Sequence, residues 1–368
     1  MQAIRRLLEV SPFDGLAVAP FIEAVQTTLA LLLERFPVYA TFLRTHGVQS
    51  LPNCLEEIHQ LPALYLPVLK GLRFALPEGL HIEMELTSSG TTGLPSVTPL
   101  DADSVHGRVA AMLASYRGMG IVDRPLTALA FLLDPATTRL AGSLVIDAVL
   151  RVAPEITGYR YLARMGNAAP EFDGAAALQA FREAKGPLLL IGYPALISAA
   201  IDRLQAQGVP RLPLAEGSRI LTGGGWKAFL PGVHLDQSQF RQQVADFFAI
   251  APSAIRDMYG LSECPAVFVQ CEHGSYHVPS FCWAQAIDPE TGDEVPAGQI
   301  GLLQLTTPLT TSYPLLKILT TDKVRLGSGC PCERIAPTLQ PLGRVAAARF
   351  DTCAMKIGEA VASQRILA

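Results

Sequence analysis

The chain has 368 residues, of which 49% are hydrophobic and 17% are charged, and its mean hydropathy is +0.29. This apolar content excludes a disordered chain, and the length suffices for two or three domains' worth of folded mass at roughly 100 to 200 residues per domain. The 29 Lys and Arg residues against 33 Asp and Glu residues give a net charge of -4 without any basic block. We therefore expect a globular protein and no nucleic-acid partner.

The longest uncharged apolar stretch, residues 187–201, contains Gly192, Tyr193 and Pro194 and is shorter than the roughly 20 residues that span a bilayer. We expect no membrane span. Residues 1–15 lack the pattern of a secretory signal, which favours a cytoplasmic protein. Seven cysteines, an odd number that lie mostly after residue 263, fit reduced thiols or metal ligands better than a disulfide framework.

Hydrophobic periodicity predicts an α/β fold. Apolar residues recur at helical spacing over residues 21–43, so the amino-terminal part, residues 1–80, is expected to be helical. From residue 81 to 264, short apolar runs alternate with amphipathic stretches, which is typical of a sheet with crossover helices. Strands are expected at residues 126–133, 187–192 and 219–222, and helices at 195–207 and 238–250, the second capped by Ser238.

Strands and turns predominate after residue 264. We expect strands at residues 283–287 and 301–306, separated by a turn at residues 288–292. Residues 265–345 are therefore interpreted as a β-rich subdomain. Together with the preceding parts it would complete a core of residues 1–345, and residues 346–368 would form a tail.

Two glycine-containing segments are typical of nucleotide sites. Residues 87–96, Thr-Ser-Ser-Gly-Thr-Thr-Gly-Leu-Pro-Ser, offer unobstructed backbone N–H groups and hydroxyl donors for phosphate oxygens, although the segment lacks the Lys of a Walker loop. Residues 221–227, Leu-Thr-Gly-Gly-Gly-Trp-Lys, follow a predicted strand, where open α/β sheets place ligands. The alternatives are a solvated turn for the first segment and a tight turn for the second.

Two further segments add polar groups that suit a nucleotide. Residues 258–263, Met-Tyr-Gly-Leu-Ser-Glu, supply an aromatic plane, a hydroxyl and a carboxylate for Mg²⁺; the alternative is a helix-to-strand connection with a solvated Glu. In the last segment, Asp322 can accept hydrogen bonds from ribose hydroxyls and Arg344 can add a second polar contact. Each of these features is common by itself.

Taken in order, the segments resemble those of adenylate-forming enzymes, which include acyl-CoA synthetases. The motifs Gly223-Gly-Gly-Trp-Lys227, Thr311-Ser-Tyr-Pro314 and Cys330-Pro-Cys332 are most similar to the acyl-protein synthetases of bacterial luminescence fatty acid reductase complexes. Phenylacetate-CoA ligases are similar but more distant. The resemblance covers most of residues 80–350 and implies activation of a carboxylic acid by ATP, followed by acyl transfer to a thiol.

The resemblance also implies roles for individual residues. The positions that would bind ATP are Thr87, Ser88, Ser89, Gly90, Thr91, Thr92, Gly93, Gly223, Gly224, Gly225, Tyr259, Gly260, Ser262, Asp322 and Arg344. Glu263 would bind Mg²⁺. Lys227 is a candidate for stabilising negative charge on the carboxylate or α-phosphate, and its alternative is a surface Lys in a loop.

The chain departs from the wider family at two places. Many adenylate-forming enzymes carry a Lys at the end of the phosphate loop, where this chain has Ser96, so the charge of the loop is reduced. The wider family also ends in a mobile domain with a catalytic Lys. Only 24 residues follow Arg344, which are too few for a domain, and we expect this small carboxyl-terminal domain to be absent and the hinge truncated.

The late cysteines predict a structural zinc site. Cys271 and His277 are separated by five residues, and Cys330 and Cys332 by one. Three thiolates and one imidazole would form a closed tetrahedral site that leaves no open position for substrate. His273 competes with His277 for the fourth position, and the alternative to a metal is a set of buried free thiols.

The thiol that accepts the acyl group is not determined by the sequence. The resemblance implies an acyl-enzyme on a cysteine near the carboxyl terminus, for which Cys353 is the candidate, and an acyl reductase as partner. The alternative is that residues 351–361 resemble the family's hinge segment and that Cys353 has no role in acyl transfer. Coenzyme A and the phosphopantetheine of an acyl carrier protein are the other acceptors. A hypothesis of another class is a non-catalytic homologue that binds a nucleotide or a carrier protein.

Overall fold

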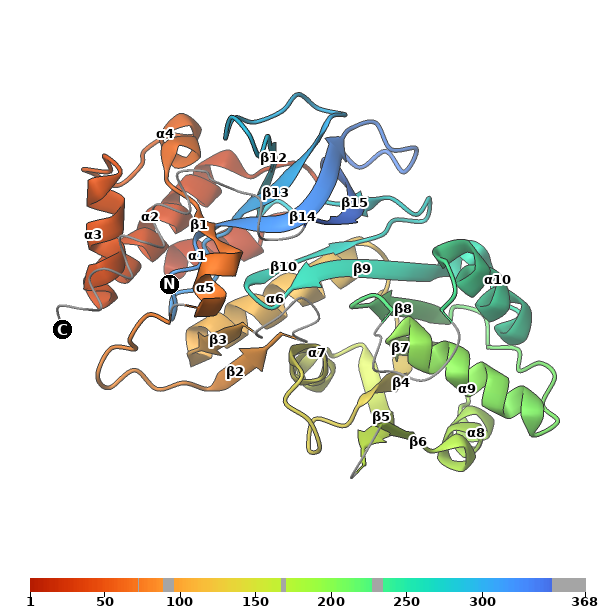
Figure 1. The fold of residues 1–368 in the computed structure, drawn as a ribbon. Coiled ribbons are helices and arrows are strands. Elements are labelled where there is room, and N and C mark those ends of the chain that lie inside the picture. Colours follow the sequence, from red (N-terminus) through yellow and green to blue (C-terminus); the bar gives the residue numbers. More distant parts are fainter. Residues whose placement is uncertain (72, 89–95, 167–169, 227–233, 346–368) are drawn as a thin grey trace. The chain divides into compact units, whose positions relative to one another are not determined.

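The computed structural model describes every residue except 72, 89–95, 167–169, 227–233 and 346–368 (Figure 1). Contacts divide the chain into two compact units. The first unit comprises Met1–Ala114, Leu261–Phe268 and Tyr276–Ala368, and the second comprises Ser115–Gly260 and Val269–Ser275.

Short helices form the amino-terminal part of the first unit. They are α1 (Gln2–Leu8), α2 (Val18–Arg35), α3 (Pro37–Thr45), α4 (Leu55–Gln60) and α5 (Leu66–Gly71). Helix α2 buries one face, with Phe21, Val25 and Leu29 completely inaccessible to solvent, and α3 begins at Pro37, whose missing N–H costs nothing at a first helical turn. The helical prediction for residues 21–43 is therefore confirmed apart from the break at Phe36.

The first unit also contains a six-stranded sheet with the order β11-β15-β14-β13-β12, in which β1 pairs in parallel with β14. Its strands are β1 (Leu64–Tyr65), β11 (Tyr276–His277), β12 (Trp283–Ile287), β13 (Ile300–Thr306), β14 (Lys317–Gly327) and β15 (Thr338–Arg344). A separate hairpin is formed by β2 (Met84–Thr87) and β3 (Val97–Leu100), and α6 (Ala102–Gly118) follows it. The expected strands at 283–287 and 301–306 and the turn between them are confirmed.

A seven-stranded sheet has the order β10-β9-β8-β7-β4-β5-β6, and the four pairings that join β9, β8, β7, β4 and β5 are parallel. Its strands are β4 (Leu126–Leu133), β5 (Ile156–Met165), β6 (Pro170–Phe172), β7 (Leu188–Gly192), β8 (Arg219–Gly223), β9 (Ile255–Leu261) and β10 (Cys264–Val269). The connecting helices are α7 (Ala141–Val152), α8 (Gly174–Glu183), α9 (Pro194–Ala206), α10 (Gln237–Phe248) and the single turn η1 (Pro252–Ala254).

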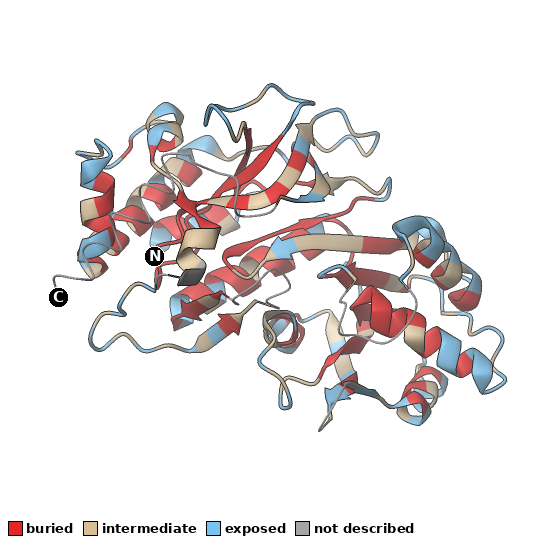
Figure 2. Ribbon diagram, in the orientation of Figure 1, coloured by how far each residue is buried: buried red, intermediate tan, exposed pale blue. Residues whose placement is uncertain are grey.

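Burial explains why the sheet predictions agree with the structure. Every residue of β7 and nearly every residue of β4 is buried, as expected for inner strands covered on both faces (Figure 2). The predicted cap of α10 is wrong by two residues. Asp236 is the N-cap: its side chain accepts from the Gln239 N–H, and the Gln239 side chain accepts from the Asp236 N–H.

Among the helices in the described ranges, none is long and apolar enough to cross a membrane.

Candidate active site and metal cluster

The β2–β3 hairpin holds the two ends of the predicted phosphate loop together. The Ser88 N–H donates to the Ser96 carbonyl oxygen at 3.0 Å, and the Ser96 N–H donates to Ser88 Oγ at 2.8 Å. These two bonds close the base of the loop, which we call the loop neck (Ser88 and Ser96). Thr87, the last residue of β2, pairs with Val97, the first residue of β3, and this pair adjoins the loop neck. The other predicted loop residues, Ser89, Gly90, Thr91, Thr92 and Gly93, lie outside the described residues.

The carboxylate of Glu263 lies at the loop neck. Glu263 follows β9 in the turn to β10 and is only 6% exposed. Ser96 Oγ donates to its Oε1 at 2.5 Å, and Ser262 Oγ donates to its Oε2 at 2.9 Å. The alternative of a solvated Glu in a helix-to-strand connection is therefore wrong: the connection joins two strands, and the carboxylate is buried and hydrogen-bonded.

A buried guanidinium fixes the turn that carries Glu263. Arg108, on α6, is 4% exposed and donates to the carbonyl oxygens of Leu261 and Ser262, at 3.4 and 2.6 Å. Burial lowers the pKa of Arg108 to about 10, while the charges of Cys264 and Glu263 act in the opposite direction. Sequence reasoning missed Arg108, because a single Arg within a helix is usually on the surface.

The glycine triplet lies at the carboxyl end of β8, next to β9. Gly223 pairs with Met258, and a Cβ on Gly223 would lie 2.7 Å from the Met258 side chain. Gly224 and Gly225 have φ angles of 72° and 64°, which residues with a side chain rarely adopt. Gly223 is therefore buried against Met258, whereas the backbone at Gly224 and Gly225 is exposed. Lys227 lies outside the described residues.

Tyr259 and Gly260 continue β9 beyond Met258. Tyr259 is half-buried and Gly260 is exposed, so the end of this strand is accessible to a ligand. At the preceding position on the neighbouring strands, Thr222 Oγ1 donates to Asp257 Oδ1 at 2.5 Å. This bond joins the glycine-bearing strand to the tyrosine-bearing strand.

Asp322 and Arg344 lie opposite each other on β14 and β15. Arg344 Nε donates to Asp322 Oδ1 at 2.5 Å, and the Asp322 N–H donates to Thr320 Oγ1 at 3.0 Å. Asp322 is 5% exposed, whereas the Arg344 side chain is 46% exposed. The pair predicted from sequence is thus brought into direct contact.

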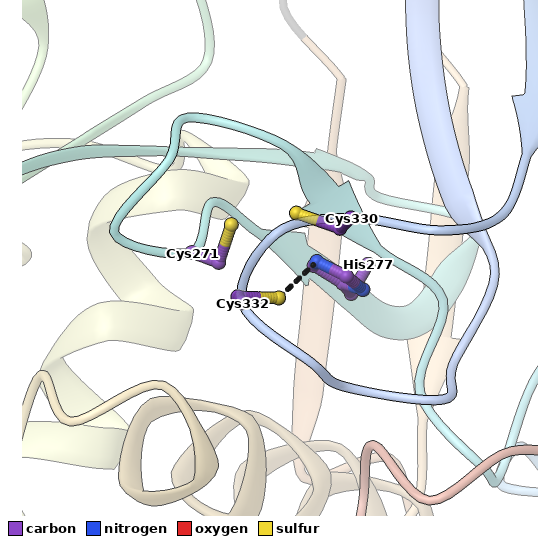
Figure 3. A group of neighbouring side chains, drawn as sticks. All are labelled: Cys271, His277, Cys330 and Cys332. Atoms are coloured by element: carbon purple, nitrogen blue, oxygen red, sulfur yellow. Dashed lines mark hydrogen bonds between the residues drawn. The ribbon is translucent and has the colours of Figure 1, made fainter.

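The four predicted metal ligands, Cys271, His277, Cys330 and Cys332, come together (Figure 3). Their ligand atoms all lie within 4.8 Å of one another. His277 Nδ1 is 3.1 Å from the Ala336 carbonyl oxygen, and its Nε2 faces Cys332 Sγ at 3.3 Å. His273, the competing candidate, is exposed and is not part of this cluster.

Two further cysteines form a buried pair that sequence reasoning did not anticipate. Cys264, the first residue of β10, and Cys282, just before β12, are both inaccessible to solvent. A hydrogen bond from Cys282 lowers the pKa of Cys264, while burial raises the pKa of Cys282. Neither thiol is exposed enough to meet a substrate. Cys353 lies outside the described residues.

Solved structures of 2-hydroxyisobutyryl-CoA ligase have the same fold. An open conformation of that enzyme, in complex with 2-HIB-AMP and CoA, aligns with a TM-score of 0.68 at 18% identity, over 90% of this chain and 76% of the other. The postadenylation state aligns equally well, over 91% of this chain and 70% of the other.

Two curated relatives match over most of the sequence, and another matches over part of it. The long-chain-fatty-acid–luciferin-component ligase of Vibrio harveyi is 25% identical over 330 residues, which are 88% of this chain and 83% of that protein. A protein of the same description from Aliivibrio fischeri is 32% identical over 142 residues, 38% of this chain and 37% of its own length. The phenylacetate-coenzyme A ligase of Thermus thermophilus is 24% identical over 335 residues, 88% of this chain and 69% of that protein.

The fold and these relatives define an AMP-forming ligase, which activates a carboxylic acid with ATP as an acyl-adenylate and then transfers the acyl group. Residues 32–362 match the family described as acyl-protein synthetase, LuxE, so the chain belongs to that family. The prediction of an adenylate-forming enzyme most similar to acyl-protein synthetases is therefore confirmed.

Proposed function

We propose that Glu263 binds the Mg²⁺ that accompanies ATP, and that the loop neck marks the phosphate end of the nucleotide site. The observation that supports this is the buried carboxylate at the base of the Ser/Thr/Gly loop. Burying an ionised carboxylate is costly unless it is hydrogen-bonded or bound to a cation. Ser96 and Ser262 each occupy one lone pair of a different oxygen, and each carboxylate oxygen has two. The carboxylate can therefore accept a cation without losing either hydroxyl.

The remaining predicted residues would surround the nucleotide in the pattern that the family resemblance implies. Thr87, Ser88 and the residues 89–93 would hold the phosphates, and Tyr259 would contact adenine. Asp322 would accept hydrogen bonds from the ribose hydroxyls, and its pairing with Arg344 orients the carboxylate and leaves the exposed guanidinium at the same edge. The exposed Gly224 and Gly225 would let adenine and the acyl group approach the backbone, while Gly223 packs against Met258 at the start of this segment.

In the first half-reaction the carboxylate of the acid attacks the α-phosphorus of ATP, and pyrophosphate leaves. Loop N–H groups and hydroxyls would stabilise the charge on the leaving pyrophosphate, and Lys227 would stabilise the carboxylate or α-phosphate. When bound, Mg²⁺ neutralises charge on the phosphate oxygens. In the second half-reaction a thiol attacks the acyl carbon, the acyl–phosphate bond breaks and AMP leaves, which yields a thioester.

Zinc fits the cluster of Cys271, His277, Cys330 and Cys332. With bonds of about 2.0 to 2.3 Å, tetrahedral ligands would lie about 3.5 to 3.8 Å apart. The observed 4.8 Å limit is close to this spacing. The Ala336 carbonyl accepts a hydrogen bond from Nδ1 of His277 and so directs Nε2 toward the thiols, as is usual around bound zinc. With four protein ligands the ion would be structural.

Three acceptors are consistent with an acyl-protein synthetase fold: Cys353, coenzyme A, and the phosphopantetheine of a carrier protein. Of the six described cysteines, three belong to the zinc cluster and two form the buried Cys264–Cys282 pair. Only Cys54 is left among them, and it is half-buried in the segment before α4. These assignments favour Cys353 as the covalent acceptor, with an acyl reductase as the next partner.

Carboxylate-dependent ATP–pyrophosphate exchange tests the proposal. The wild-type protein should catalyse exchange with at least one member of a panel of fatty and aromatic acids. Glu263→Gln should lower exchange about 100-fold or more, because a neutral amide is a poor ligand for Mg²⁺. Glu290→Gln, a change in an exposed turn, is the matched control and should retain wild-type activity. Absence of exchange with every acid would instead favour a non-catalytic nucleotide-binding protein.

The acceptor is tested with a radiolabelled acid that supports exchange. Label that stays with the denatured protein and is released by hydroxylamine indicates a thioester on the chain, and Cys353→Ala should abolish it. Label that appears in acyl-CoA only when coenzyme A is added, with Cys353→Ala as active as wild type, would reject Cys353 as the acceptor.

A further inference from the structure

Ser96 connects two predicted parts of the site, the phosphate loop and the Glu263 carboxylate that is proposed to bind the cation. The reaction itself does not require this connection. Its backbone is fixed on both sides: the N–H donates to Ser88 Oγ and the carbonyl accepts from the Ser88 N–H. Its side chain, 5% exposed, donates to Glu263 Oε1 at 2.5 Å. The position of one carboxylate oxygen is therefore set by the end of the loop.

The carboxylate is held from its other side by its own turn. Ser262 Oγ donates to Oε2, and Arg108 fixes the backbone of the turn through the carbonyl oxygens of Leu261 and Ser262. Because the turn is anchored to α6, rotation of the Glu263 side chain is the main freedom that remains. The Ser96 hydroxyl removes this freedom by binding the oxygen that Ser262 does not.

We propose that Ser96 is a positioning residue, whose hydroxyl presets the Glu263 carboxylate for the cation. The inference rests on the proposed function of Glu263 and deepens it. With one hydroxyl on each oxygen, one lone pair of each oxygen remains for the metal, and both are fixed relative to the loop neck. Ser96 does not touch the substrate in this scheme and acts only through Glu263.

A positioning role predicts a selective defect. Without the hydroxyl, Glu263 must be ordered when the cation binds, so the Mg²⁺ concentration for half-maximal exchange should rise. Loss of a hydrogen bond to a charged group corresponds to a rise in this Mg²⁺ concentration of about tenfold or more. The KM for the carboxylic acid should stay within about twofold, because no contact to the acid is changed.

The experiment compares Ser96→Ala, Ser96→Cys and Ser96→Thr with wild type in exchange assays over a range of Mg²⁺ concentrations. The Ala variant should need about tenfold more Mg²⁺, the Cys variant an intermediate amount because a thiol is a weak donor, and the Thr variant should be closest to wild type. Ser115→Ala is the matched control: it removes a buried hydroxyl that has no hydrogen-bond partner in the described structure. It should leave the Mg²⁺ dependence unchanged.

The outcomes separate this inference from the proposed function. If the wild type catalyses exchange and Glu263→Gln abolishes it, but Ser96→Ala and Ser96→Cys keep the wild-type Mg²⁺ dependence, the positioning role is wrong and the proposed function stands. A lower melting temperature with unchanged Mg²⁺ dependence would show a merely structural role. No exchange by the wild-type protein would overturn the proposed function and this inference with it. Should Ser96→Ala fail to fold, Ser96→Cys provides the test.

Discussion

Lys317 offers a direct test of how burial sets charge in the first unit. It is the first residue of β14 and is 2% exposed. Its Nζ donates to the carbonyl oxygens of Ile58 and His59, at 3.3 and 2.6 Å, near the end of α4. Burial lowers the pKa of Lys317 from 10.5 to about 8, and the negative charge of Glu294 acts in the opposite direction. The folded protein therefore releases this proton more readily than the unfolded chain.

The difference in the pKa of Lys317 between the folded and unfolded states changes the free energy of unfolding with a definite sign and size. Between about pH 8 and 10.5 the unfolded chain binds a proton that the folded protein has lost, so the free energy of unfolding rises with pH. At 1.36 kcal/mol per pH unit, the free energy of unfolding rises by about 3 kcal/mol up to pH 10.5. Below about pH 8 both states are charged, and Lys317 contributes no pH dependence.

Urea unfolding of wild type and Lys317→Met at pH values from about 7 to 10.5 measures this effect. The difference between the two free energies of unfolding should be constant below about pH 8 and then grow by about 3 kcal/mol in favour of wild type. Lys323→Met, on the same strand but only half-buried, is the control for the loss of a lysine side chain. Parallel curves for wild type and Lys317→Met would refute the reasoning, because tyrosines and other groups titrate equally in both proteins.

Three further predictions concern the zinc cluster and the backbone at Ala249 and Gly192. Protein purified without chelator should contain about one equivalent of zinc, and Cys332→Ser should lower both the zinc content and the melting temperature; metal analysis that finds no zinc would reject the cluster as a zinc site. Ala249 ends α10 with φ 50° and ψ 43°, a left-handed conformation that glycine adopts more easily. Ala249→Gly should therefore raise the free energy of unfolding by about 1 kcal/mol, and a lower free energy of unfolding in urea titrations would contradict this. Gly192→Ala should destabilise by about 2 kcal/mol or more, because the new Cβ would lie 2.1 Å from the Phe131 carbonyl oxygen; Gly186→Ala, which meets nothing within 4 Å, is the control, and equal stability of the two variants would argue against the clash.

The sequence predicts best those helices and strands in which the burial pattern stays the same over many residues. The strand expected at 126–133 has the same bounds in the structure, since almost all of its side chains are buried. Short strands give no such signal: β1 and β11 have two residues each and exist because longer neighbours provide hydrogen-bond partners. The helix cap at Asp236 was missed in favour of Ser238, since both residue types cap helices and only geometry distinguishes them.

The proximity of the four metal-ligand candidates could be predicted from sequence because their residue types have few other uses. Cysteine and histidine at these spacings have few roles besides metal binding, and the structure brings the four residues together. Ser96 and Arg108 have many uses, so their contacts with the Glu263 turn depend on a packing of segments more than 150 residues apart that no local pattern encodes. The roles of all predicted site residues stay predictions, and Lys227, Cys353 and residues 89–93 also lie outside the described residues.

The pairing of β1 with β14 has a consequence for synthesis on the ribosome. Leu64 and Tyr65 hydrogen-bond in parallel with Ile318 and Leu319, and Thr28 on α2 donates to the Pro308 carbonyl, 280 residues away in the chain. The amino-terminal helices leave the exit tunnel long before these partners exist. They must wait with apolar faces uncovered while most of the polypeptide is translated, so a nascent chain arrested before residue 308 should depend on chaperones and be readily cut by proteases.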